Sequence, residues 1–168
     1  MKRGSRRTAA SFRHLLGSAL LLFALQAQAG DFTQPRPGLH TGGQPTADQL
    51  ADFSRQGVRT VIDLRAPGED RGFDEAAAAE QNGMRYERLP IAGADDLTAA
   101  NAAALKKLLQ EGGDNVLLHC ASGNRVGALL ALMAKQEEGA SNEKALELGR
   151  QAGLKSLAPV VEQKLQAP

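Results

Sequence analysis

The sequence contains a single cysteine, Cys120, and an arginine, Arg125, lies five positions further along the chain. Between them, residues 121–124 are small or polar and include Gly123. A thiolate is a strong nucleophile, and a guanidinium can bind two oxygens of one anion. The pair therefore predicts an anion-binding loop with Cys120 and Arg125 as its catalytic candidates. The alternative is a buried structural cysteine beside a surface arginine.

The residues on either side of this loop indicate how it is held in place. Val116 to Leu118 is a short apolar run typical of a buried strand, and leucines recur at helical spacing from Val126 onward. In a loop between a strand and a helix, the free backbone amides point toward one anion, and the helix dipole adds positive potential there. The same field favours the thiolate form of Cys120. The predicted substrate-binding residues are Ala121, Ser122, Gly123, Asn124 and Arg125.

Three polar residues at the ends of predicted strands are expected to support the loop. His119 directly precedes Cys120 in a buried strand, so we expect it to orient the loop by hydrogen bonding rather than to act as a base. Asp63 and Arg65 stand at the end of a β-branched strand, Val58 to Leu64, and α/β folds build their sites at the carboxyl ends of strands. In a purely structural alternative, Asp63 caps the following turn and Arg65 pairs with it.

The segment HCASGNRVG, from His119 to Gly127, resembles the signature loop H-C-x-x-G-x-x-R of the cysteine-dependent protein tyrosine and dual-specificity phosphatase superfamily. It is most similar to the bacterial beta-lactamase-hydrolase-like phosphatase-domain branch. The segment VIDLR, ending at Arg65, resembles the equivalent strand of dual-specificity phosphatases. The resemblance implies a dual-specificity-phosphatase-like fold over about residues 39–154, and a phosphohydrolase that works through a thiophosphate on Cys120.

Two features of the loop depart from the superfamily pattern. Four residues separate Cys120 from Arg125 where the superfamily has five, and Val126 stands where it has serine or threonine. The shorter spacing also resembles the active loop of rhodanese sulfurtransferases, which holds a cysteine persulfide. A rhodanese-like sulfurtransferase is therefore the alternative function, and a non-catalytic anion-binding module is a second alternative. The expected partner is a phosphorylated small molecule or protein for a phosphatase, and a sulfane-sulfur donor for a sulfurtransferase.

An acidic pair, Asp95 and Asp96, lies upstream of the cysteine and before a predicted helix. In the resembled phosphatases, a mobile loop at a comparable position carries an aspartic acid that protonates the leaving alcohol and then activates water. The resemblance thus makes Asp95 or Asp96 the candidate general acid, since an alkoxide leaves poorly without a proton. Alternatively, these carboxylates only complement the dipole of the helix that follows.

The alternation of strands and helices predicts an α/β domain with a mostly parallel sheet. About four strands are expected, near residues 39–43, 58–64, 84–90 and 115–119, with flanking helices that complete a three-layer fold. The segment Asp31 to Gly38 is interpreted as a Pro-rich lead-in. No metal-ligand cluster or dinucleotide-binding glycine motif is found in the sequence, so no cofactor is expected.

The first 29 residues are predicted to be a Sec-type signal peptide. They combine a basic start, a short apolar stretch from Leu15 to Leu25, and a small-x-small cleavage site ending at Ala29. The apolar stretch is too short to span a membrane comfortably, and the remaining chain has no stretch of spanning length, so no stable membrane insertion is expected after cleavage. The product, residues 30–168, is expected to be one phosphatase-like α/β domain that is periplasmic or secreted.

Charge excludes one further class of partner. The whole chain has 20 basic and 19 acidic residues, but five of the basic ones lie in the first 29 positions, so the predicted product carries 15 against 19, a net charge of −4. Because no basic patch with interleaved aromatic residues is present, a nucleic-acid partner is not expected.

With one cysteine, the product has no internal disulfide and depends on its apolar core.

Overall fold

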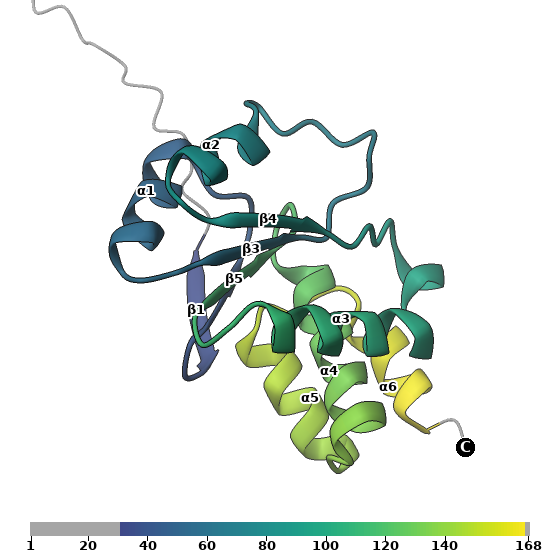
Figure 1. The fold of residues 1–168 in the computed structure, drawn as a ribbon. Coiled ribbons are helices and arrows are strands. Elements are labelled where there is room, and N and C mark those ends of the chain that lie inside the picture. The colour runs from purple at the N-terminus through teal and green to yellow at the C-terminus, as the bar shows by residue number, and fades with distance from the viewer. Residues whose placement is uncertain (1–30, 167–168) are drawn as a thin grey trace, which may run out of the picture.

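The computed structural model describes residues 31–166, which form a five-stranded sheet between two layers of helices (Figure 1). The strands are β1 (Phe32–Arg36), β2 (Leu39–Gly42), β3 (Thr60–Asp63), β4 (Arg85–Arg88) and β5 (Val116–His119). Their order in the sheet is β1-β2-β5-β3-β4, and every neighbouring pair is parallel except β1 and β2. The predicted three-layer α/β fold is confirmed, whereas the predicted signal peptide lies outside the described residues.

Two groups of helices cover the two faces of the sheet (Figure 1). The helices are α1 (Ala47–Arg55), α2 (Glu75–Gln81), α3 (Ala99–Glu111), α4 (Asn124–Glu138), α5 (Asn142–Gln151) and α6 (Ala158–Gln166), with a short 3-10 helix η1 (Ala94–Asp96) before α3. The α1 and α2 pair packs over a small apolar core on one face, and α3 to α6 enclose the larger core on the other. No helix of residues 31–166 is long and apolar enough to cross a membrane.

Side-chain caps set the starts of several helices. Thr46 and Gln49 form both hydrogen bonds of a capping box at α1. Thr98 accepts the amide of Asn101 at the start of α3, and Ser141 caps α5 in the same way. Each cap satisfies an amide that the first helical turn leaves free, so local sequence alone determines where these helices begin.

The segment interpreted as a Pro-rich lead-in is in fact a strand, so the sheet has five strands instead of about four. Residues 32–36 form β1, which pairs antiparallel with β2 and lies at the edge of the sheet. Proline lacks an amide hydrogen, but an edge strand leaves one side unpaired and therefore tolerates Pro35. The aromatic ring of Phe32 packs edge-on against Phe53 of α1, with ring centroids 4.9 Å apart. This distant contact is not visible in the local sequence pattern.

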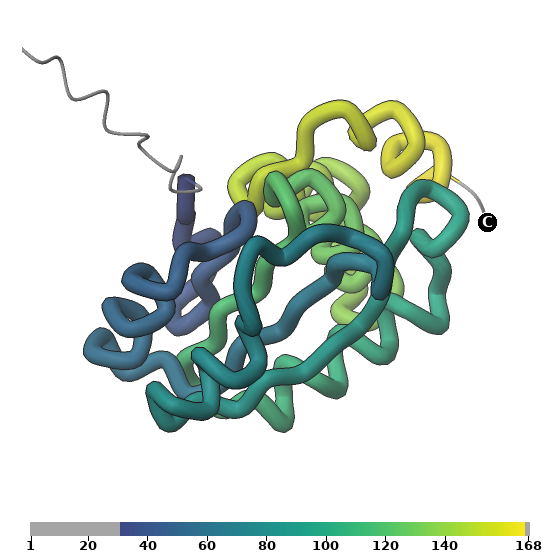
Figure 2. Tube along the Cα trace, turned by 90° about the horizontal axis from the view of Figure 1, so that it is seen from above, coloured from purple at the N-terminus to yellow at the C-terminus, as the bar shows by residue number. Residues whose placement is uncertain are grey.

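The parallel register brings the carboxyl ends of three strands together beneath the cysteine. His119, the last residue of β5, pairs with Asp63 of β3 on one side and with Gly42 of β2 on the other. The chain then leaves β5 directly into the Cys120 loop. The long connection from β3 to α2 extends away from the body of the domain in Figure 1, and in Figure 2, seen from above, it crosses in front of the rest of the chain. The fold thus gathers polar residues from several segments at one edge.

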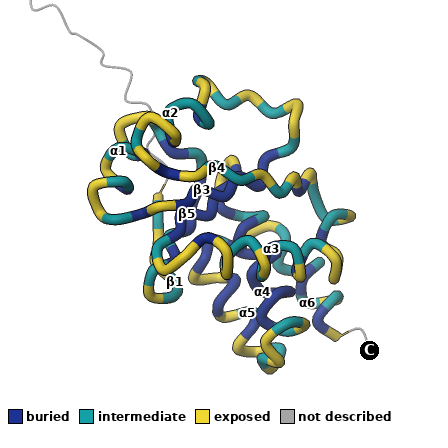
Figure 3. The backbone as a smooth tube through the Cα atoms, viewed as in Figure 1, coloured by how far each residue is buried: buried dark blue, intermediate teal, exposed yellow. Residues whose placement is uncertain are grey.

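Helix α4 follows the loop and is the most enclosed helix, with every residue from Val126 to Ala134 buried (Figure 3). It approaches the α5 helix and the turn after it very closely at Gly127. A β-carbon added at Gly127 would lie 2.2 Å from the amide nitrogen of Leu154 and 2.4 Å from the carbonyl oxygen of Gly149. Both atoms belong to the backbone, so the clash cannot be relieved by a side-chain rotation.

We therefore predict that Gly127→Ala destabilises the fold by about 1–3 kcal/mol, the usual cost of forcing extra volume into a packed core. Urea unfolding followed by circular dichroism measures this loss. Gly68→Ala is the matched control, since Gly68 is exposed and no atom would lie within 4 Å of its added β-carbon. Equal stability of the two variants would show that α4 and the turn after α5 can separate at little cost.

Candidate active site

The Cys120 loop connects β5 to α4 in a single tight turn. Gly123 adopts a left-handed conformation with φ of 83°, which a side chain would strain, and it is the N-cap residue of α4. Its amide donates a hydrogen bond to the Cys120 sulfur at 3.2 Å, and the Cys120 amide donates to the carbonyl oxygen of Gly42 at 3.3 Å. The thiol is fully buried at the base of the loop. The turn therefore directs a backbone donor at the sulfur, as a thiolate requires.

The remaining loop residues are fixed mainly by backbone contacts. The Ala121 carbonyl oxygen accepts the amide of Gln44 at 3.3 Å, and exposed Ser122 forms an isolated bridge with Gly43. The Asn124 side chain accepts the amide of Lys155 at 2.8 Å and donates to the Ser156 hydroxyl at 2.7 Å, which ties the α5–α6 connection to the loop. Because glycine has no side chain, Gly123 starts α4 without a side-chain cap. Amides of its first turn are thus available to an anion.

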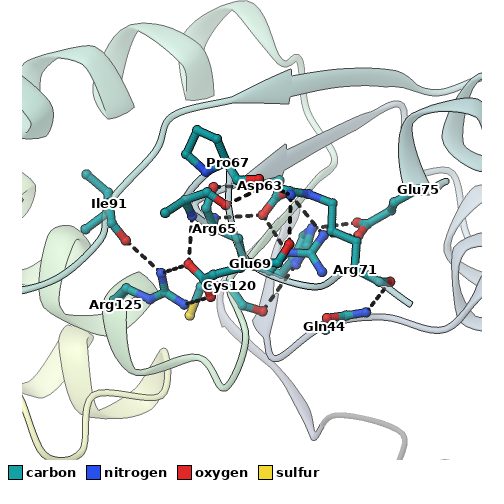
Figure 4. A network of polar contacts seen from close by, with 12 residues as sticks. Gln44, Asp63, Arg65, Pro67, Glu69, Arg71, Glu75, Ile91, Cys120 and Arg125 are labelled. Carbon is teal, nitrogen blue, oxygen red and sulfur yellow. Dashed lines mark hydrogen bonds and ion pairs between the residues drawn. The ribbon is translucent and has the colours of Figure 1, made fainter. Parts of the chain in front are cut away.

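Arg125 extends back from the first turn of α4 toward the strand ends (Figure 4). Its Nη1 atom donates to the carbonyl oxygen of Ile91 at 2.7 Å and to Glu69 Oε1 at 2.5 Å, while Nη2 donates to Glu69 Oε2 at 2.7 Å. The hydrogen bonds that Arg125 donates to Glu69, together with the nearby Cys120, outweigh burial and raise the pKa of Arg125. The structure therefore brings Cys120 and Arg125 together, as the sequence predicts, and adds a carboxylate to them.

Glu69 was not expected from the sequence. It belongs to the polar loop between β3 and α2, and the Ala66 amide also donates to its Oε1 at 2.7 Å. The hydrogen bond from Arg125 lowers the pKa of Glu69 against the opposing effect of burial, so the carboxylate is charged at neutral pH. The one sequence feature that could have indicated a role for Glu69 is its position shortly after the carboxyl end of β3, where sites in α/β folds are built. Many acidic residues on protein surfaces occupy such a position without any function.

The candidate general acids lie on the neighbouring loop after β4. An open depression lies between the β3–α2 loop, the β4–α3 loop, the Cys120 loop and the residue before α6. Its lining residues are Ala66, Glu69, Ala92, Gly93, Asn124, Arg125 and Leu157. Asp95 is exposed, and Asp96 accepts the Ala92 amide at 2.7 Å. Neither aspartate lines the depression, but both follow Gly93 of its lining by two or three positions along the chain. Their role as proton donors stays a prediction.

A buried polar cluster lies beneath the loop and contains the three predicted supporting residues. Arg65 donates from Nε to Asp63 Oδ1 at 2.9 Å, and its backbone amide donates to the same oxygen at 2.8 Å. The guanidinium also pairs with Glu75 of α2. Both carboxylates and Arg65 are completely buried. The structural alternative for Asp63 and Arg65, a capped turn with an internal ion pair, is what the structure shows.

His119 connects this cluster to the loop. Its Nε2 atom lies 2.7 Å from Glu75 Oε1, although not in the direction of a well-aligned hydrogen bond, and Nδ1 lies 3.3 Å from the Cys120 carbonyl oxygen. The imidazole thus contacts the backbone of the nucleophile and an acid on the opposite side. This placement fits the orienting role expected for His119, and Glu75 is a second residue that the sequence did not indicate.

Two further residues complete the environment of Asp63. Tyr86 of β4 donates its hydroxyl to Asp63 Oδ2 at 2.6 Å, and Arg71 donates from Nε to the same oxygen at 3.2 Å. Burial by itself raises the pKa of Asp63, but the hydrogen bonds from Arg65 and Tyr86 and the surrounding positive charge hold it well below its usual value. Burial and the Asp63 acceptor raise the pKa of Tyr86. Asp63 is therefore a charged acceptor and Tyr86 a neutral donor.

The side chains of Asp63, Glu75 and His119 could in principle hold a metal ion, since their ligand atoms lie within 4.8 Å of one another. The Arg65 guanidinium already bonds both carboxylates, and Arg71 adds a second positive charge. The two negative charges are thus balanced, and a cation placed there would face Arg65 at short range. We assign the cluster a structural role.

Comparison with known proteins identifies the family. Residues 28–163 match the family model described as "DSP-PTPase phosphatase fused to NAD+ Kinase". The chain belongs to this family. Over 98 residues the chain is 38% identical to the beta-lactamase hydrolase-like protein of Xylella fastidiosa strain Temecula1. This match covers 56% of this chain and 22% of that protein. The chain therefore spans about a fifth of the length of this curated relative.

Solved structures show the same fold at lower identity. A putative phosphatase from Neisseria meningitidis superposes with a TM-score of 0.66 at 18% identity, covering 78% of this chain and 96% of that one. P. aeruginosa TpbA in complex with pTyr superposes with a TM-score of 0.63 at 21% identity, covering 86% and 92%. The family model confirms the predicted membership of the dual-specificity and tyrosine phosphatase superfamily and supports a phosphatase, and the solved structures show the same fold.

The buried cluster generates a stability prediction. We expect Arg65→Met to destabilise the fold by about 3–5 kcal/mol, because it leaves buried Glu75 without its cation and Asp63 with only the partly exposed Arg71. Urea unfolding at neutral pH measures this loss. Arg55→Met is the matched control, since Arg55 pairs with Asp52 on the exposed surface of α1 and its removal should change little. If Arg65→Met were as stable as the control, the cluster would not hold the strand ends together.

Proposed function

We propose that the chain is an exported, cysteine-dependent phosphohydrolase that forms a thiophosphate intermediate on Cys120. The observation that carries the proposal is the meeting of a buried thiol, a guanidinium and an uncapped helix start at one loop. Family membership supports a phosphorylated substrate, as does the pTyr bound to TpbA. Export is proposed from residues 1–29, whose composition is that of a signal peptide.

The proposed reaction has two steps. The Cys120 thiolate attacks phosphorus, an S–P bond forms, and the bond from phosphorus to the leaving oxygen breaks as Asp95 or Asp96 protonates that oxygen. Arg125 and the loop amides stabilise the negative charge on the non-bridging oxygens. Water, deprotonated by the same aspartate, then attacks phosphorus, and the S–P bond breaks to release orthophosphate and the thiolate.

The nucleophile and the arginine are tested together. We expect purified protein under reducing conditions to hydrolyse an aryl phosphate, Cys120→Ser to abolish phosphate release, and Arg125→Lys to lower kcat/KM by about 10²-fold or more because it loses the two-pronged contact. Arg36→Lys is the matched control, because Arg36 forms an equivalent two-bond contact with Glu138 and should leave activity unchanged. Sulfur transfer from thiosulfate to cyanide is assayed in parallel. Thiocyanate formation without phosphate release would replace this proposal with the sulfurtransferase.

The general acid is tested by leaving-group dependence. If Asp95 or Asp96 donates the proton, its change to Asn should reduce kcat by about 10²–10⁴-fold for an alkyl phosphate and much less for 4-nitrophenyl phosphate, whose leaving group needs no proton. Comparing the two substrates for each variant separates proton donation from loop damage. This comparison matters most for Asp96, because its carboxylate also accepts a hydrogen bond from the Ala92 amide and its loss could disturb the loop. Equal losses on both substrates would exclude that residue as the acid.

A further inference from the structure

The depression beside the Cys120 loop presents mainly small apolar residues to solvent. Ala66, Ala92, Gly93 and Leu157 belong to its lining, and none of them has a polar atom in its side chain. They come from the β3–α2 loop, the β4–α3 loop and the residue before α6, and each is at least partly exposed. Ligand sites are usually lined in this way, with apolar contact area and a few polar groups that fix orientation.

The polar side chains of the lining already have partners within the protein. Arg125 donates to both carboxylate oxygens of Glu69, at 2.5 and 2.7 Å (Figure 4). The Asn124 oxygen accepts the amides of Lys155 and Leu157, at 2.8 and 3.3 Å, and its nitrogen donates to a neighbouring serine hydroxyl. A buried hydroxyl without a partner costs free energy, so the lining favours a bound group that needs few hydrogen bonds.

Charge restricts the bound group further. Among the described residues that line the depression, Arg125 is the one cation. Its bonds to Glu69 and Ile91 leave the Nε edge of the guanidinium, beside Cys120, for a phosphate group. A second anionic group in the depression would meet the Glu69 carboxylate without a further cation from the lining. An uncharged group meets no such repulsion.

The candidate proton donors place the leaving alcohol on this side of the loop. Asp95 and Asp96 follow Gly93 of the lining by two and three positions, and a general acid must reach the leaving oxygen. The carbon chain attached to that oxygen would then extend over the depression. Leu157 is the largest apolar residue there, and its hydrogen bond to Asn124 ties its position to the Cys120 loop.

The aromatic residues of the described chain lie elsewhere. Those of residues 31–166 are in or against the smaller core, with α1 and α2 on the opposite face of the sheet: Phe32, Phe53, Phe73 and Tyr86. A phenolic ring would therefore find no aromatic partner in the lining. An aliphatic chain needs only contact with hydrocarbon, which alanine and leucine side chains supply.

We propose that the depression is a leaving-group subsite for the phosphate monoester of an uncharged aliphatic alcohol, with Leu157 as its specificity-determining contact. This inference rests on the proposed function, because the phosphate group is assigned to the Cys120 loop and Arg125. Affinity should rise with the length of the apolar chain. A polyol of similar length gains little, since its hydroxyl groups leave water for a lining with few partners.

The experiment measures binding of methyl, ethyl, propyl and butyl phosphate and of glycerol 3-phosphate by titration calorimetry in the non-hydrolysing Cys120→Ser background. We expect Kd to fall by about two- to fourfold for each added methylene, the upper value corresponding to full burial. Glycerol 3-phosphate should bind about as weakly as methyl phosphate.

Variants at Leu157 test the contact itself. Leu157→Asn, which keeps the branched shape but is polar, should raise Kd for butyl phosphate by about fivefold and leave Kd for methyl phosphate unchanged. Leu157→Met should retain the dependence on chain length. Leu146→Asn is the matched control, because Leu146 is also a partly buried leucine packed on the larger core but lies on α5 outside the depression. Thermal unfolding confirms that each variant is folded.

Equal binding of methyl and butyl phosphate, tighter binding of glycerol 3-phosphate than of butyl phosphate, or an equal loss on both alkyl esters in Leu157→Asn would overturn the inference. The proposed function would survive each of these results. If no phosphate ester bound and the unmodified protein released no phosphate, the proposed function and this inference would both be wrong.

Discussion

The site depends on one buried guanidinium. Arg65 pairs with Asp63 at the end of β3 and with Glu75 at the start of α2, all without access to water. Buried charges are tolerated only when they are paired and hydrogen-bonded, so these segments cannot separate without a large cost in free energy. Because Glu75 also contacts His119, and His119 contacts the Cys120 backbone, the cluster holds the base of the loop as well.

Above this rigid base, the functional groups occupy less constrained positions. Cys120 is enclosed and receives one backbone donor, whereas Arg125 and Glu69 are partly exposed at the surface of the depression. The Cys120 loop is fixed by the strand, the helix and Asn124, but the Glu69 loop is held mainly through Arg71. The nucleophile is therefore held more tightly than the charged pair that lies nearer the surface.

Local sequence patterns account for much of the fold. The apolar runs at β3 and β5 predicted these strands correctly, since a strand of this type is encoded within a few consecutive residues. The edge strand β1 was missed because Pro35 argues against a strand, and only pairing with β2 and packing of Phe32 on Phe53 reveal it. Glu69 and Glu75 were missed because nothing in a polar loop or an Ala-rich helix distinguishes an acid that meets an arginine from one that faces solvent.

The sequence by itself determined the family, the sheet's parallel core and the pairing of Cys120 with Arg125, because a strand, a short glycine-containing turn and a helix lie consecutively in the chain. Only the tertiary structure decided which carboxylates meet the cations: Glu69 reaches Arg125 across 56 residues, and Glu75 reaches His119 from another layer of the fold. The physical reason is that hydrogen bonds and ion pairs act over a few ångströms in space. Which residues come within that range is set by strand order and register, and local composition does not encode it.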